Sequence, residues 1–278
     1  MSEKDIILRK IANTLIVYSY HMDENGLFTG KTGAMLYLYL FAEEYDSQTC
    51  YDFAAEILDG LMKSTQKAPA SFEDGIAGLG WSVGRLIRSG IVDGNANTVL
   101  AGIDRQLVEA MMRERWSASW NELLYFADRI KDRPAPVDRH DLQELILTFI
   151  KWQLNGPTAG KLSEERNKAI RHYLKSYRAV YGMTKNISEL WSKAGESTSE
   201  DSVAPRDLYP DKRSAMHDWI IKSIHQYFFG QRMPQIPDFH ALGQYVDMTM
   251  EGLVPAELAL AGGLAGLGTV ILARRLHN

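Results

Sequence analysis

The chain has little of three features that mark familiar protein classes. Its one cysteine, Cys50, cannot form an intrachain disulfide. There is no excess of positive charge, because 31 Lys and Arg residues stand against 35 Asp and Glu residues, for a formal net charge of −4. Nucleic acid is therefore not an expected partner. The first residues also lack the basic-then-apolar order of a secretory signal, which predicts a cytoplasmic protein.

Long hydrophobic runs are also absent. A membrane-spanning helix needs about 20 mostly apolar residues, and the nearest candidate, residues 258–273, is shorter and rich in glycine. Its apolar residues Leu264, Leu267, Val270 and Ile271 fall on one helical face, which is typical of a buried helix. We therefore expect a core helix here and do not expect a membrane partner.

A glycine pattern occurs three times, and each copy runs into an apolar stretch with helical spacing. The copies are Gly30-Lys31-Thr32-Gly33, Gly75-Ile76-Ala77-Gly78 and Gly263-Leu264-Ala265-Gly266. Apolar residues recur at helical spacing through most of the chain, and no convincing alternating strand competes with them. The interval from Gly75 to Gly263 is close to four times the interval from Gly30 to Gly75, so the spacing fits a regular repeat. An interval of this length holds two helices, which indicates a helical hairpin as the repeating unit. We predict an all-α fold in one domain over residues 1–278.

The predicted helices are of two kinds. Those that begin with the glycine pattern carry small residues, whereas those between them, such as residues 51–66 and 97–115, carry more charge. Glycine in a helix is less favourable than alanine by about 1 kcal/mol, so its repeated use favours close helix contact around an axis. An α/α toroid, with an inner ring of helices inside an outer ring, satisfies both observations. Residues 193–207 are polar and predict an exposed loop.

Residues 26–33, 72–81 and 262–268 resemble the starts of inner helices in lanthionine synthetase C-like proteins. The resemblance covers about residues 25–90 and 258–273, and the chain is short for that family. It implies an α/α toroid whose inner helices point their N-termini at a central cavity. The cyclases of the family close thioether rings in a ribosomally made peptide, with a zinc ion held by two cysteines and a histidine.

The family's zinc ligands have no counterpart in this chain. Its final ligand pair is Cys-His directly before a repeat glycine, where this chain has Ala261 and Gly262 in the third repeat and Glu73 and Asp74 in the second. One cysteine cannot rebuild a thiolate ligand set, and we expect Cys50 to be an ordinary small residue of an outer helix. No metal site and no cofactor is predicted.

Glu73 and Asp74 precede the second repeat, at the predicted mouth of the cavity. Adjacent carboxylates can bind a cationic group or act as acid and base; alternatively, they stabilise the positive end of the helix dipole. Trp81 falls on a different face of that helix from Ile76 and Leu79. It either lines a pocket wall or packs in the core.

A second polar and aromatic group lies between residues 235 and 251, in a predicted loop at the mouth of the ring. No catalytic residue is assigned. The candidate pocket-lining residues from both groups are Glu73, Asp74, Trp81, His240, Tyr245, Asp247 and Glu251.

Functions of different classes fit these observations. The first is a pseudoenzyme, a zinc-free lanthionine synthetase C-like protein that binds a peptide or protein partner as an accessory in the maturation or export of a ribosomal peptide. The alternative is a carbohydrate-active toroid enzyme, which needs two carboxylates about 5 to 9.5 Å apart across a cavity. A purely structural scaffold is the third. A filled centre would exclude both catalytic interpretations.

Overall fold

The computed structural model describes residues 1–113, 116–117, 119–132, 137–156, 163–195 and 212–273. Regular structure in these ranges is helical and includes no strand, as the periodicity predicts. No helix in them combines the length and apolar character needed to cross a bilayer. The elements are α1 (Glu3–Tyr18), η1 (Ser19–His21), α2 (Lys31–Tyr45), α3 (Gln48–Ser64), η2 (Thr65–Lys67), α4 (Ile76–Arg88), α5 (Ala96–Val99), α6 (Ala101–Met112), α7 (Glu122–Arg129), α8 (Val137–Asn155), α9 (Glu164–Tyr181), α10 (Lys185–Lys193), α11 (Lys212–Phe228), α12 (Phe239–Glu251), η4 (Pro255–Leu258) and α13 (Leu264–Ala273).

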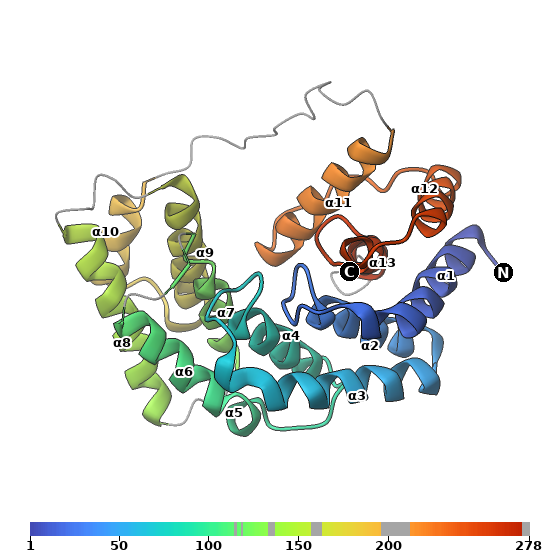
Figure 1. Cartoon of the computed structure of the whole chain (residues 1–278). Helices are drawn as coiled ribbons and strands as arrows, with labels where there is room; N and C mark the ends of the chain where they lie inside the picture. Colours follow the sequence, from blue (N-terminus) through green and yellow to red (C-terminus); the bar gives the residue numbers. More distant parts are fainter. Residues whose placement is uncertain (114–115, 118, 133–136, 157–162, 196–211, 274–278) are drawn as a thin grey trace.

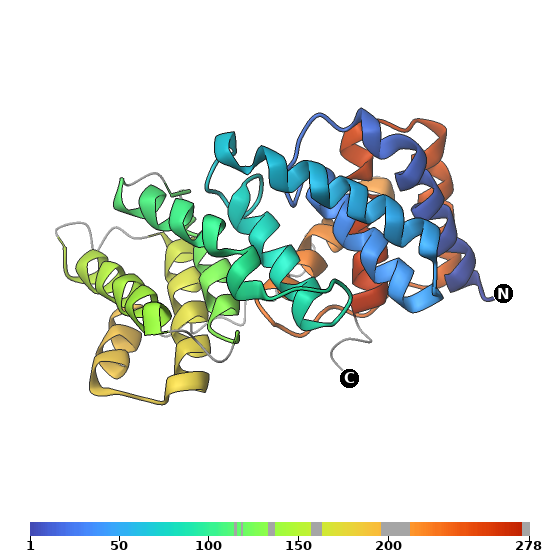
Figure 2. The same cartoon turned by 90° about the horizontal axis from the view of Figure 1, so that it is seen from below.

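Helices that are far apart in the sequence pack side by side. α13 packs against α2 and α11, α2 against α4, α4 against α7, and α7 against α9. α1 lies against α2, α12 and α13, so the first and last helices meet on one side of the molecule. α8, α9 and α10 lie at the opposite side (Figure 1 and Figure 2).

Burial separates the helices into the two predicted kinds. Every residue of α13 is buried, and α2 is buried from Thr32 to Ala42. α3 is longer but buries only Cys50, Ala54 and Leu61, which form a stripe along one face. A helix buried on all sides lies inside a protein, whereas a one-sided helix covers the surface. Cys50 is a free, buried residue of this outer layer, as predicted.

Gly30 and Gly75 are the N-cap residues of α2 and α4, and their backbones are nearly identical. Their φ and ψ angles are −127° and −164° at Gly30 and −134° and −163° at Gly75. In both repeats the first helical N–H donates to the carbonyl seven residues earlier, at 3.0 Å and 2.9 Å. A Cβ atom at Gly30 or Gly75 would overlap that same carbonyl, in Glu24 and Pro69 respectively. The tight turn before each helix therefore requires glycine.

The second glycine of each repeat permits close packing between neighbouring repeats. A Cβ atom at Gly33, Gly78 or Gly266 would overlap the carbonyl six residues earlier. At Gly78 it would also lie 2.8 Å from Leu27 Cβ, and at Gly33 it would lie 2.8 Å from Leu260 Cβ. Leu27 and Leu260 belong to the loops of the adjacent repeats. The close contact expected from the glycine spacing is thus confirmed.

The two predicted loops have different outcomes. The loop predicted across residues 235–251 is wrong beyond Asp238, because Phe239–Glu251 forms α12. The Asp238 side chain begins this helix by accepting hydrogen bonds from the backbone N–H groups of His240, at 2.8 Å, and Ala241, at 3.4 Å. In the loop predicted at 193–207, Lys193 ends α10, and residues 196–207 lie outside the described part of the chain.

Candidate functional site

Main-chain hydrogen bonds join the three loops that precede α2, α4 and α13. The N–H of Ala261 donates to the carbonyl of Phe28 at 2.9 Å, and the N–H of Phe28 donates to the carbonyl of Glu73 at 2.8 Å. Each of these residues stands two positions before the first glycine of its repeat. The repeats therefore meet in register. Residues 26–30, 71–75 and 259–263 together form a surface that we call the loop face.

Polar side chains connect the loop face to the next helix. The carboxylate of Glu73 accepts a hydrogen bond from the side-chain amide of Asn121, the residue before α7, at 2.5 Å. The hydroxyl of Thr29 donates to the carboxylate of Asp74 at 2.8 Å, so the first and second repeats are also linked through side chains. Thr29 and Asp74 are exposed, whereas Glu73 is partly buried. The loop face thus presents oxygen acceptors to solvent.

An aromatic cluster fills the space beneath the loop face. Phe28 and Phe72 come from its loops, Trp81 from α4 and Phe228 from the end of α11, and all four are buried. The ring of Phe228 stacks on Phe28 at 5.4 Å and contacts Trp81 edge-on at 4.8 Å, measured between ring centroids. Trp81 is 3% exposed, so the structure places it in this core rather than on an open wall.

Glu73 lies near two further titratable groups. Burial lowers the pKa of His225 and the nearby Lys168 lowers it further, whereas the Glu73 carboxylate raises it. Burial also raises the pKa of Glu122. The hydrogen bonds that its carboxylate accepts from the N–H and the hydroxyl of Ser117, at 2.7 Å and 2.8 Å, act in the opposite direction and lower it. Glu122 is fully buried, so only the partly buried Glu73 and His225 can reach a ligand at the loop face.

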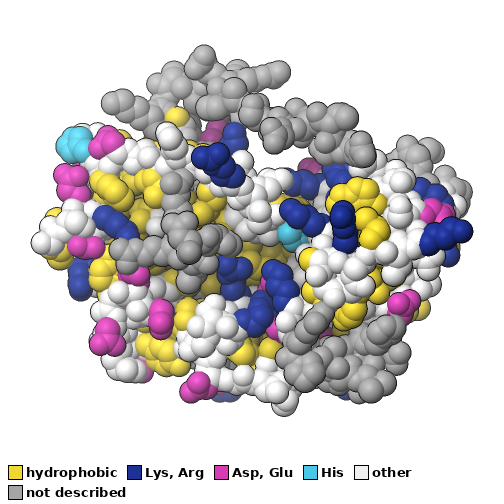
Figure 3. Space-filling model, turned by 180° about the vertical axis from the view of Figure 1, so that it is seen from behind, with side chains coloured by type: hydrophobic (Ala, Val, Ile, Leu, Met, Phe, Trp, Pro, Cys, Tyr) yellow, Lys and Arg dark blue, Asp and Glu magenta, His cyan; other side chains and the backbone are white. Residues whose placement is uncertain are grey.

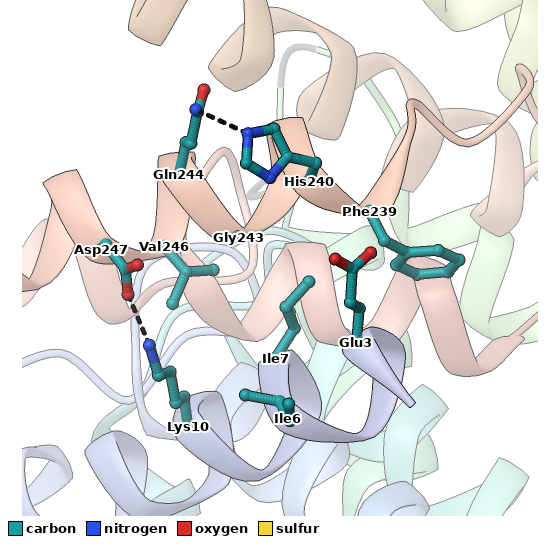
Figure 4. Close-up of a pocket in the computed structure, with 10 residues that line it drawn as sticks. All are labelled: Glu3, Ile6, Ile7, Lys10, Phe239, His240, Gly243, Gln244, Val246 and Asp247. Atoms are coloured by element: carbon teal, nitrogen blue, oxygen red, sulfur yellow. Dashed lines mark hydrogen bonds and ion pairs between the residues drawn. The ribbon is translucent and has the colours of Figure 1, made fainter. Parts of the chain in front are cut away.

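His240 and Asp247 lie elsewhere, in a groove of about 190 Å³ between α1 and α12 (Figure 4). The carboxylate of Asp247 pairs with the ammonium of Lys10 at 2.7 Å, and both side chains are about half exposed. The imidazole of His240 contacts the Gln244 amide at 3.0 Å. Ile7 and Val246 also line this groove. Four of its polar side chains, Lys10, Asp247, His240 and Gln244, are thus already engaged in pairs.

The structure does not bring the seven candidate residues into one site. Tyr245 is buried and donates its hydroxyl to the carbonyl of Gly262 at 2.9 Å, and Glu251 is exposed at the end of α12. Glu73 and Asp74 belong to the loop face, whereas Asp247 belongs to the groove. Comparison with protein families, curated proteins and solved structures gives no match for this chain.

The residues at the third repeat do not fit a zinc ion. Gly262, which has a φ of +79°, lies against the imidazole of His217 from α11, and a Cβ atom at Gly262 would overlap that ring. His217 therefore fills the space of the missing side chain, and Ala261 offers no thiolate. Across the described ranges, no three His, Cys, Asp or Glu side chains lie close enough together to hold a metal ion.

Three residues near Glu73 were not singled out by the sequence patterns. Asn121, Lys168 and His225 come from the start of α7, from α9 and from α11, and only the packing of these helices brings them near the second repeat. Asn121 directly precedes α7, a helix for which no apolar face was predicted from the sequence. Lys168 and His225 had no signal in the sequence, since each lies inside an amphipathic helix.

Proposed function

We propose that the protein is a zinc-free, lanthionine synthetase C-like α/α toroid that binds a peptide or protein partner at its loop face. It serves as an accessory in the maturation or export of a ribosomally made peptide. The observation that carries the proposal is the row of hydrogen bonds through Ala261, Phe28 and Glu73. Such a row is expected where equivalent loops of successive repeats pack around an axis.

The order of helix contacts supports the ring. Contacts run from α11 to α13, then through α2, α4 and α7 to α9. On the remaining side, Phe229, the residue after α11, contacts Lys168 and His172 of α9. These inner helices alternate in sequence with α1, α3, α6, α8, α10 and α12, as hairpins of a toroid do.

The aromatic cluster favours a partner that lies on the surface. Small-molecule sites are concave and enclose most of their ligand, whereas the space beneath the loop face is filled by buried rings. The exposed Asp74 carboxylate and Thr29 hydroxyl suit the backbone amides and cationic side chains of an extended peptide. This packed base also disfavours the carbohydrate-active alternative, which needs an open cavity between its carboxylates.

Fluorescence anisotropy with labelled peptides encoded beside this gene tests the proposal. Asp74→Asn combined with Thr29→Val removes the exposed negative charge and the exposed hydroxyl, and we expect binding about tenfold weaker, equivalent to about 1.4 kcal/mol. Asp59→Asn is the matched control, because Asp59 is an exposed carboxylate on α3, away from the loop face. The proposal would be contradicted if none of the peptides encoded beside the gene bound, or if the control variant lost as much binding affinity as the double variant.

A further inference from the structure

Basic side chains from three helices gather around the end of α11. Arg85 comes from α4, Lys131 follows α7, and Lys168 comes from α9; we call these three the cationic cluster, and the imidazole of His172, also from α9, lies beside it. The ammonium of Lys168 lies 4.2 Å from the ring centroid of Phe229, and the His172 ring lies 5.5 Å from the same centroid. Lys and Arg side chains gather around a His side chain near the middle of one face in Figure 3.

An ion-pair network lies beside the cluster and includes one of its members, Lys131. It joins three largely buried carboxylates, Asp104, Asp128 and Asp132, to Arg88, Arg129 and the half-exposed Lys131. Arg85 and Lys168 are outside it, and no carboxylate oxygen in the described residues lies within 4 Å of either side-chain charge. Glu164, on the same helix as Lys168, is paired with Arg171 at 2.5 Å. Arg85 and Lys168 therefore supply the positive charge of the cluster that is not taken up by an ion pair.

Aromatic rings hold the cations in place. The guanidinium of Arg85 lies over the rings of Trp81 and Tyr227, at 5.4 Å and 4.9 Å from their centroids. Lys168 lies over Phe229, two residues beyond Tyr227. A cation over a ring face is attracted to the ring without losing its charge, as it would lose it in part to a carboxylate partner. The aromatic residues at the end of α11 thus support donors from both neighbouring helices.

Burial and neighbouring cations lower the pKa values of Lys131 and Lys168. Burial lowers the pKa of Lys131, and Arg88 and Arg85 lower it further. Burial also lowers the pKa of Lys168 and Arg171 lowers it further, whereas Glu164 and Glu165 raise it. An anion that entered the cluster would relieve this repulsion between like charges.

We infer that the cationic cluster binds a phosphate-type anion, for which inorganic diphosphate is the simplest probe. The charges are spread over α4, the end of α7 and α9, which matches an anion with more than one charged group better than a single carboxylate. The net charge of −4 opposes a long nucleic acid but does not prevent a small anion from reaching a local cluster. This inference goes beyond peptide binding at the loop face and does not depend on it.

Isothermal titration of the full chain with sodium diphosphate tests the inference at constant ionic strength. We expect saturable binding, weaker binding of inorganic phosphate, and about tenfold weaker diphosphate binding in Lys168→Met and in Arg85→Gln. Lys63→Met is the matched control, because Lys63 is an exposed lysine on α3. Equal affinity in the control and cluster variants would overturn the inference, as would tighter binding of poly-glutamate or duplex DNA than of diphosphate.

Melting temperatures measured with and without diphosphate distinguish a variant that no longer binds the anion from one that no longer folds. Lys131→Met serves as the additional variant, because its side chain is 56% exposed and its replacement leaves the core intact. We expect diphosphate to raise the melting temperature of the wild type and of Lys63→Met, but to have less effect on Lys131→Met. A shift of equal size in all three proteins would overturn the inference. No peptide is present, so the result is independent of the test at the loop face.

Discussion

The ring of Tyr37 in α2 occupies the space that a side chain at Gly268 in α13 would need. The same relationship recurs between α4 and α7, where a Cβ atom at Gly80 would lie 2.6 Å from Tyr125 Cε2. Each tyrosine hydroxyl also donates to an adjacent outer helix, at 2.7 Å to α1 and at 2.5 Å to α6. The same type of contact, a glycine against a tyrosine ring, thus joins α13 to α2 and α4 to α7.

Gly268→Ala is expected to destabilise the protein by about 2 kcal/mol, because the methyl group forces α13 away from the hydrogen-bonded Tyr37 ring. Gly60→Ala is the control. Gly60 lies in helix α3 and has no atom within 4 Å of an added Cβ, so alanine there is expected to stabilise by up to about 1 kcal/mol. Urea unfolding measures both changes, and a loss of equal size at both positions would contradict this packing.

Arg129→Met is expected to lower the free energy of unfolding by about 3 to 5 kcal/mol, because buried carboxylates lose their partner. Arg129 is 2% exposed and pairs with Asp104 at 2.7 Å and with Asp132. Lys63→Met breaks an ion pair whose side chains are 75% and 72% exposed, so it is expected to change stability by less than about 0.5 kcal/mol. Similar urea midpoints for the two variants would refute the burial argument.

Stability is expected to fall as the pH is lowered through the titration of His172. Burial, followed by Lys131 and Lys175, lowers the pKa of His172 from 6.5 to about 4. Between these values the unfolded chain binds a proton that the folded chain does not, so the free energy of unfolding decreases toward low pH, by at most about 3 kcal/mol. Denaturation of wild type and His172→Gln at several pH values measures the difference. Parallel pH profiles would show that His172 contributes nothing.

Asp238→Ala is expected to lower stability by about 1 kcal/mol, because the backbone N–H groups at the start of α12 lose their acceptor. Asp247→Asn breaks only the ion pair with Lys10, whose two side chains are 45% and 57% exposed, and is expected to lower stability by less than about 0.5 kcal/mol. Thermal unfolding ranks the two variants, and the reverse order would be inconsistent with the cap at Asp238.

The helices that begin at Gly30 and Gly75 were predictable because their signals are local: a tight turn requires glycine, and the apolar residues follow at helical spacing. α12 was missed although Leu242, Tyr245, Val246 and Thr249 also recur at helical spacing. The concentration of polar and aromatic residues between 235 and 251 favoured a loop, although Asp238 is a residue type that commonly caps the start of a helix.

The candidate site was only partly predictable. Glu73 was identified because it precedes a repeat, and its position in the turn follows from the sequence. Its hydrogen bond to Asn121 joins residues on different helical hairpins, and the proximity of His225 depends on how α11 packs against the loops. No periodicity within a single helix records such contacts between helices. Trp81 was ambiguous because a helical face is assigned to core or cavity only by its neighbours.

The contact between α13 and α2 has a consequence for the synthesis of the protein. Tyr37 leaves the ribosome long before Gly268 is made, so the buried surface of α2 must remain without its neighbour α13 until all the intervening helices have been made. Contacts between such distant residues slow folding and prolong the exposure of apolar surface. The nascent chain is therefore expected to expose the apolar surface of α2 that faces α13 until α13 has emerged.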